Sequence, residues 1–213
     1  RGMSLDDFNS PLMRAGRLAC ACPEQLRQES LVDNRATLAT GFGLAVLAQA
    51  LVLSVLPEQS RLLAPNIQTI GLPFALLLIG AALASFPAAF LVDAFGRRAA
   101  FGLGASLGAA GGALCAFALT RGNFFGLCLG AFWLGLAQGF ALFYRHVAAQ
   151  GPSAQGALAT FGGGALGALL APAVIALAQT PGATLMSAAA LHICALALSV
   201  RLPHMRGEAF AAP

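Results

Sequence analysis

The chain has 213 residues, of which 58% are hydrophobic and only 9% are charged. Water-soluble domains carry about 25% charged residues, so this composition excludes one and predicts a protein solvated by lipid. The formal net charge of +4 comes from arginines that fall between apolar runs. It therefore serves membrane orientation and gives no reason to expect a nucleic-acid partner.

Residues 1–35 are the one long polar segment, and we expect them to form a cytoplasmic N-terminal segment. Ser4 and Asp7 have the spacing of a helix-start box, and Pro23 followed by Glu24 suits a second helix start. These patterns favour short helices lying on the membrane surface. A partly ordered tail is the alternative.

Two cysteines in this segment, Cys20 and Cys22, form a C-x-C pair. Thiolates bind soft metals such as Cu(I), so copper or another soft metal is a candidate ligand here. A single pair supplies only two of the four ligands of a structural zinc site, and cysteines without a metal are the alternative. No resident cofactor is otherwise expected.

Charge-free runs divide the rest of the chain. Four of them, between residues 35 and 145, each suit one spanning helix of about 20 residues. The fifth run, residues 146–200, is long enough for two helices, with a turn at Gln179–Gly182. The expected helices cover residues 37–56, 72–92, 99–119, 124–144, 155–178 and 183–200.

These runs do not alternate in polarity, as the strands of a membrane β-barrel would. The predicted fold class is therefore an all-α membrane protein with six transmembrane helices. They form one domain at residues 36–201, followed by a cytoplasmic tail at 202–213.

The placement of the arginines predicts that both termini are cytoplasmic. With six helices, ten arginines fall on the side of the termini and two on the other side. The ten are Arg1, Arg14, Arg17, Arg27, Arg35, Arg97, Arg98, Arg145, Arg201 and Arg206, and the two are Arg61 and Arg121. By the positive-inside rule, this indicates a multi-pass protein of a bacterial inner membrane with N-in and C-in orientation.

The loop between the second and third expected helices reads DAFGRR, residues 93–98. It resembles the signature loop of the major facilitator superfamily, G-x-x-x-D-[RK]-x-G-[RK]-[RK]. Asp93, Gly96, Arg97 and Arg98 match this motif, whereas Ala89 and Ala94 depart from it. The resemblance implies that the four matching residues help to control which side of a transporter is open.

Each matching residue also has a physical reason to be there. Gly96 permits a tight turn between two long helices, and Arg97 and Arg98 hold the loop on the cytoplasmic side. Asp93 lies at a helix end, where its carboxylate can pair with an arginine or with the positive end of a neighbouring helix.

The fourth and fifth expected helices add a fainter resemblance. Their G-x-x-Q-G, F-Y-R and Gly-rich stretches, followed by Pro172, are similar to patterns in proteobacterial members of the superfamily, which include copper importers. The superfamily resemblance covers residues 37–200. It implies one six-helix half, built as a 3+3 repeat, of a transporter that normally has two halves.

Polar side chains inside apolar spans are candidates for a substrate path. Gln49, Gln138 and His192 lie inside the expected helices, and Tyr144 and Arg145 lie at the cytoplasmic end of the fourth. His192 is the one deep group that titrates near neutral pH, with a hydrogen bond to a neighbouring helix as the alternative role. Arg145 could attract an anion or pair with Asp93, with snorkelling to the interface as the alternative.

We therefore expect a half-size transporter that works as a dimer by alternating access on a small solute or a metal ion. No nucleotide-binding loop or catalytic constellation is present, so an enzyme is not expected. The alternative is a non-transporting membrane subunit or assembly factor that holds a larger complex together. Its partners would be other membrane proteins, whereas the transporter would pair with a second copy.

Overall fold

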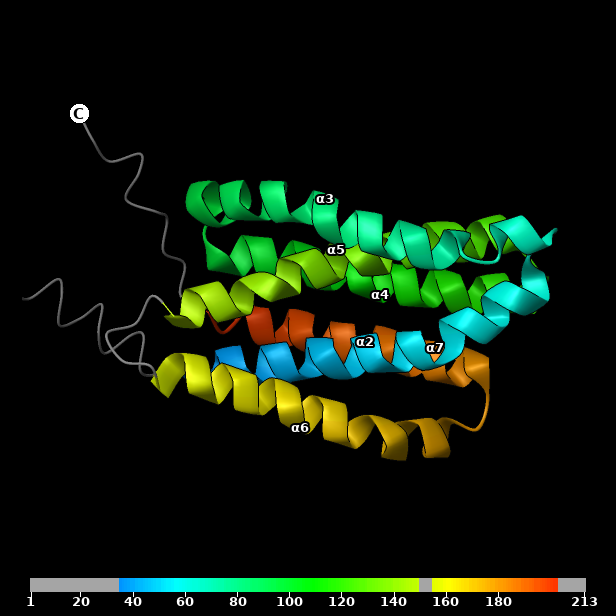
Figure 1. The fold of residues 1–213 in the computed structure, drawn as a ribbon. Helices are drawn as coiled ribbons and strands as arrows, with labels where there is room; N and C mark the ends of the chain where they lie inside the picture. The colour runs from blue at the N-terminus through cyan, green and yellow to red at the C-terminus, as the bar shows by residue number, and fades with distance from the viewer. Residues whose placement is uncertain (1–34, 150–154, 203–213) are drawn as a thin grey trace, which may run out of the picture.

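The computed structural model describes residues 35–149 and 155–202, and Figure 1 shows their course. All regular structure in these ranges is helical. The elements are α2 (Arg35–Leu63), η2 (Ile67–Thr69), α3 (Leu72–Phe95), α4 (Arg97–Arg121), α5 (Phe124–Ala149), α6 (Gln155–Ala178) and α7 (Pro181–Ser199). The six α-helices are each long and apolar enough to cross a membrane, which confirms the predicted fold class.

The helix ends agree with the sequence prediction to within five residues, except at the end of α2. That helix was expected to stop at residue 56, before Pro57 and Glu58, but it continues to Leu63. Its last turn is stabilised by an ion pair between Glu58 and Arg61, in which Nη2 and Oε1 are 2.6 Å apart. A helix can therefore extend beyond the apolar run when its polar end is itself satisfied.

The expected turn at residues 179–182 separates α6 from α7. Gln179 takes a left-handed conformation with φ 59°, which is a common way to end a helix. Thr180 then caps α7, because its Oγ1 accepts a hydrogen bond from the Ala183 N–H at 3.2 Å. Pro181 occupies the first turn, where its missing N–H costs nothing.

Successive helices run in opposite directions, as Figure 1 shows. The start of α2, the α3–α4 connection, the gap between α5 and α6 and the end of α7 therefore meet at one end of the bundle. We call this the arginine-rich end, because Arg35, Arg97, Arg98, Arg145 and Arg201 lie there. Arg61 and Arg121 lie at the opposite end.

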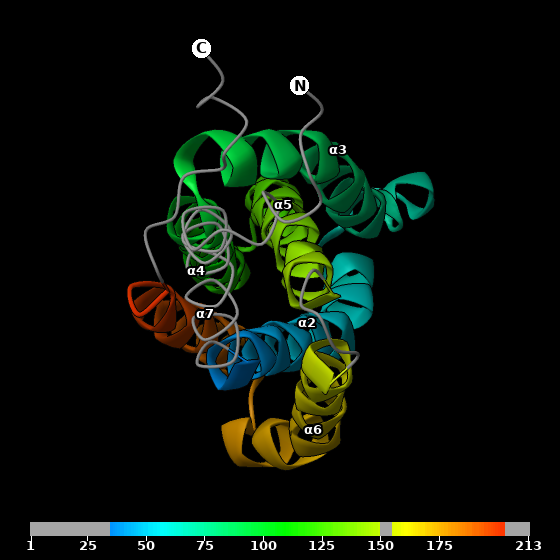
Figure 2. The same ribbon diagram turned by 90° about the vertical axis from the view of Figure 1, so that its left-hand side faces the viewer.

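The packing of the helices follows a 3+3 repeat. Helix α2 packs mainly on α6 and α7, and α5 packs mainly on α3 and α4. Exchanging α2 with α5, α3 with α6, and α4 with α7 reproduces this pattern. The view along the bundle in Figure 2 shows α3 and α6 at opposite edges, with the other four helices between them.

The two outer helices are also the least covered. Only 22% of the apolar window of α3 and 17% of that of α6 are buried, against 56% for both α2 and α5. Their remaining surface must therefore face lipid or another membrane protein.

Small residues allow the outer helices to approach their neighbours closely. A Cβ added at Gly135 of α5 would overlap the carbonyl oxygen of Leu77 in α3. A Cβ added at Gly163 of α6 would likewise overlap the carbonyl oxygen of Ala39 in α2. Close backbone contact of this kind is how helices associate in lipid, where the hydrophobic effect does not drive them together.

Candidate functional site

The loop at residues 93–98 is a turn around a single residue. Gly96 alone separates α3 from α4, with φ 84° and ψ 167°, a conformation that essentially only glycine adopts. Arg97 is half-buried, Arg98 is exposed, and position 93 lies on the last turn of α3. The Asp93 side chain is outside the part of the structure that can be described. The gating role of these four residues stays a prediction.

The two glutamines lie near the middle of their helices. Gln49 on α2 and Gln138 on α5 are about 21 and 16 Å from the arginine-rich end, counting about 1.5 Å of rise per residue. Both are half-buried, and neither hydrogen-bonds another residue in the described ranges. Their amides are therefore available to a solute or water at mid-depth.

Tyr144 of α5 and His192 of α7 line the same small cavity inside the bundle, together with residues of α2 and α4. The Tyr144 ring stacks on Phe101 of α4, with centroids 3.9 Å apart and planes within 5°. The His192 ring lies against Gly108, where a Cβ would collide with it. The two side chains line a small cavity, about large enough for one water molecule.

This cavity is too small for an organic solute. Neither Tyr144 nor His192 forms a hydrogen bond to another residue within the described ranges. The bond to a neighbouring helix, the alternative role of His192, is therefore not seen among these residues. The two groups are therefore placed to hold a water inside the six-helix bundle. Their position on a substrate path stays a prediction.

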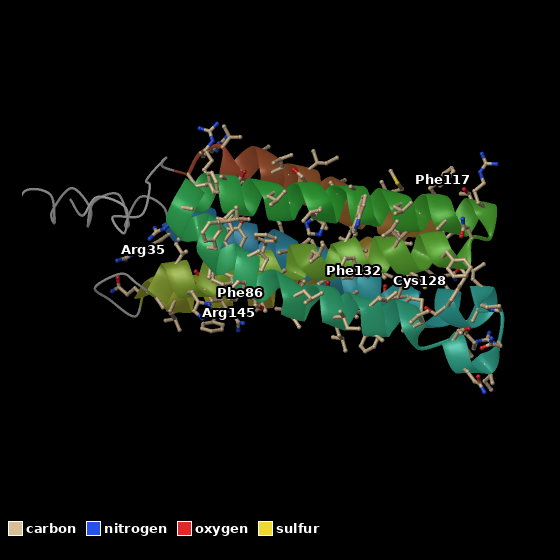
Figure 3. The ribbon with its side chains drawn as sticks, turned by 90° about the horizontal axis from the view of Figure 1, so that it is seen from above. Arg35, Phe86, Phe117, Cys128, Phe132 and Arg145 are labelled. Atoms are coloured by element: carbon tan, nitrogen blue, oxygen red, sulfur yellow. The ribbon has the colours of Figure 1, made fainter. Side chains whose placement is uncertain are left out.

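Arg145 on α5 reaches a different place, between α2 and α6. Its Cζ lies 5.7 Å from the ring centroid of Phe42 and 5.8 Å from that of Phe161. Figure 3 shows Arg145 toward the same end of the bundle as Arg35. The Nε atom is buried without a hydrogen-bond partner among the described residues. The guanidinium is thus held by two rings from two other helices.

Comparison with known proteins agrees with this architecture. The model of the sugar (and other) transporter family matches residues 28–144, more than half of the chain. The chain belongs to the major facilitator superfamily. The expected family is therefore confirmed.

A curated relative of this chain is the riboflavin transporter RfnT of Brucella anthropi. The two are 39% identical over 79 residues, which are 37% of the chain and 20% of the relative. The match thus spans about a fifth of the relative's length, so it supports a membrane transporter and leaves the solute open.

The candidate metal residues Cys20 and Cys22 lie outside the described residues. Within the described ranges, no three His, Cys, Asp or Glu side chains gather closely enough to hold a metal ion. Cys115 and Cys128 are buried in the transporter, and Cys194 is exposed. Cys115 donates a weak hydrogen bond to the Leu127 carbonyl oxygen at 3.7 Å, which gives it a packing role.

Sequence reasoning named Arg145 but missed Phe42 and Phe161. Each is the single phenylalanine of its charge-free run, but neither run indicates which residue of another helix the ring contacts. Only the packing of α2 and α6 on either side of α5 brings them to the arginine. The contact of Arg145 with these two rings depends on tertiary structure, which the sequence around each residue does not reveal.

Proposed function

We propose that this transporter moves a small organic solute across a bacterial inner membrane by alternating access between two six-helix bundles. The chain supplies one bundle, and a second copy supplies the other. Both termini of each copy lie in the cytoplasm, as the excess of arginines at one end of the bundle favours.

The observation that carries the proposal is the pair of outer helices. Helices α3 and α6 are related by the repeat, lie at opposite edges and bury little of their apolar surface. Large side chains stay exposed on both: Leu78, Leu83, Phe86 and Phe90 on α3, and Leu166, Leu169 and Leu170 on α6. Two such helices can each pack against a second bundle, with the solute between the two bundles at mid-depth.

Gln49 and Gln138 are the side chains that we expect to meet the solute. They come from the two helices at the centre of the repeat, and their amides can both donate and accept hydrogen bonds. Riboflavin is the first compound to test, because the relative in Brucella anthropi is a riboflavin transporter. Its ring edge carries hydrogen-bond donors and acceptors of the kind that glutamines recognise.

The test uses the purified full chain in proteoliposomes with radiolabelled riboflavin, together with native mass spectrometry of the same sample. We expect two copies per particle and saturable uptake. Gln138→Leu should lower uptake at least tenfold because it removes an amide proposed to bind the solute, whereas Gln68→Leu, on exposed η2, should leave it unchanged. A particle containing other subunits, with no uptake of any solute tried, would instead support the scaffold role.

A further inference from the structure

Arg145 lies near the arginine-rich end of α5. It is four residues before the end of that helix, and Phe42 is seven residues after the start of α2. With about 1.5 Å of rise per residue, the cluster is about 6 to 10 Å inside the helix ends. A snorkelling arginine would extend past the helix end into the interface. The Arg145 side chain instead lies beside rings from two other helices.

The two rings lie close to the guanidinium but offer its N–H groups no conventional hydrogen-bond acceptor. Both centroids are within about 6 Å of Cζ, the range of a cation–π contact. The five N–H donors, however, lie in the guanidinium plane and need acceptors there. The buried Nε has none among the described residues.

Nor does a described carboxylate balance the charge. The two acids in the described ranges are Glu58, which pairs with Arg61 at the opposite end, and Asp93, whose side chain is not described. The side chain thus has two ring contacts and an Nε–H without an acceptor among the described residues. A cation with an unused donor suits an oxygen-rich anion.

There is also space beside the cluster. Phe161 is about half exposed, and a Cβ added at the next residue, Gly162, would meet no atom within 4 Å. This side of α6 is therefore open at the depth of the arginine. A ligand could approach from the outer face of α6 without displacing a neighbouring helix.

We propose that Arg145, oriented by Phe42 and Phe161, binds a carboxylate or phosphate group. The group belongs either to the transported solute or to a lipid headgroup. The first source rests on the proposed function and narrows the solutes to organic anions. Riboflavin carries no such group, so with riboflavin as the substrate the lipid is the expected source.

The test measures thermal unfolding of the full chain through its single tryptophan, Trp133, in nanodiscs of phosphatidylcholine. The probes are benzoate and its neutral analogue benzamide, at ionic strength matched with sodium chloride. We expect benzoate to raise the unfolding midpoint and benzamide to leave it unchanged. Arg145→Gln should abolish the benzoate shift, and Phe161→Leu, at a half-exposed position that tolerates the change, should reduce it.

Arg121→Gln is the matched control. Arg121 also lies over a ring, 5.3 Å from the centroid of Phe117, but both side chains are exposed at the opposite end. This variant should keep the full benzoate shift. Because a neutral residue replaces an arginine in both variants, a difference between them isolates the position from the loss of charge.

Nanodiscs containing phosphatidylglycerol distinguish the two sources. A midpoint raised by this lipid in the wild type but not in Arg145→Gln, with no further shift from benzoate, assigns the site to a headgroup. A benzoate shift that persists in both lipids assigns it to a solute. Responses that are absent, or the same in Arg145→Gln as in the wild type, would overturn the proposal. Riboflavin uptake is measured separately, so uptake that persists without any anion response refutes only this site.

Discussion

The seam between α3 and α5 and the seam between α2 and α6 occupy equivalent places in the repeat, and both are built from small residues four apart. The pairs are Gly80 and Ala84 on α3, Gly135 and Gly139 on α5, Ala39 and Gly43 on α2, and Gly163 and Gly167 on α6. In each seam, a Cβ added at one of these glycines would meet a backbone carbonyl of the partner helix. The same device thus holds both outer helices.

The two seams differ at the arginine-rich end. The α3–α5 seam continues into a wholly apolar cluster of Ala84, Ala88, Ala100 and Phe140. The α2–α6 seam instead passes Arg145 between its two rings and ends where Arg35 Nη1 donates to Gln155 Oε1 at 2.9 Å. Packing follows the repeat, whereas the contact of an arginine with two rings is described only at the α2–α6 seam. This difference places the candidate site at that seam.

Breaking the α3–α5 seam should have the largest effect. In Gly135→Leu, the new side chain would overlap the backbone of Leu77, which no rotamer change can relieve. Relief would require the outer helix α3 to shift, and α3 is somewhat more covered than α6, with 22% of its apolar window buried against 17%. We expect a loss of about 3 kcal/mol or more and little folded protein after detergent extraction. Size-exclusion profiles and Trp133 fluorescence would measure this.

The milder change Gly135→Ala should fall between the wild type and the leucine variant. Normal folding of Gly135→Leu would contradict the close approach of the two backbones.

Breaking the α2–α6 seam should have a smaller effect on stability and a specific one on the arginine. Gly163→Leu creates a similar overlap with the Ala39 backbone, but α6 lies at the edge of the bundle and can shift outward. We expect a loss of about 1–3 kcal/mol in thermal unfolding. Because an outward shift moves Phe161 away from Arg145, the benzoate response should also fall.

If Gly163→Leu destabilises the protein but keeps the full benzoate response, this prediction is wrong. The position of Phe161 would then not depend on the α2–α6 seam.

The sequence was sufficient to predict the parts of the fold that depend on local chemistry. Charge-free runs located six helices, and the bounds of the helix at residues 155–178 were correct at both ends. The single-glycine turn at Gly96 follows from the same kind of reasoning, because only glycine tolerates its backbone conformation. In each case the deciding interaction lies within a few residues along the chain.

The candidate site depends on contacts that are distant in sequence, so it could be predicted only in part. Arg145 was identified because a charge at the end of an apolar run is conspicuous. Its ring partners lie 103 residues before it and 16 residues after it, and nothing in their own runs indicates the contact. The hydrogen bond considered as the alternative role of His192 is not formed with a described residue, and its ring lies against Gly108, which has no side chain to offer.

The smallest effect is expected one residue away from the second seam. Gly162→Leu adds a side chain where a Cβ meets no atom within 4 Å, so the isolated bundle should keep its stability to within about 0.5 kcal/mol. Leucine is also the better helix former, which favours a slight gain. Thermal unfolding of Gly162→Leu and of Gly163→Leu therefore compares two adjacent glycines on different faces of α6.

The same variant examines what covers the outer face of α6. If a second bundle packs there, the added leucine should lower the fraction of dimer in native mass spectra and slow solute uptake, while the unfolding midpoint stays unchanged. If lipid alone covers this face, dimer and uptake should both persist, because a leucine is as soluble in lipid as the residues around it. That result would assign the contact between the two bundles to α3 instead of α6. The two outer helices would then differ in function as well as in their contacts.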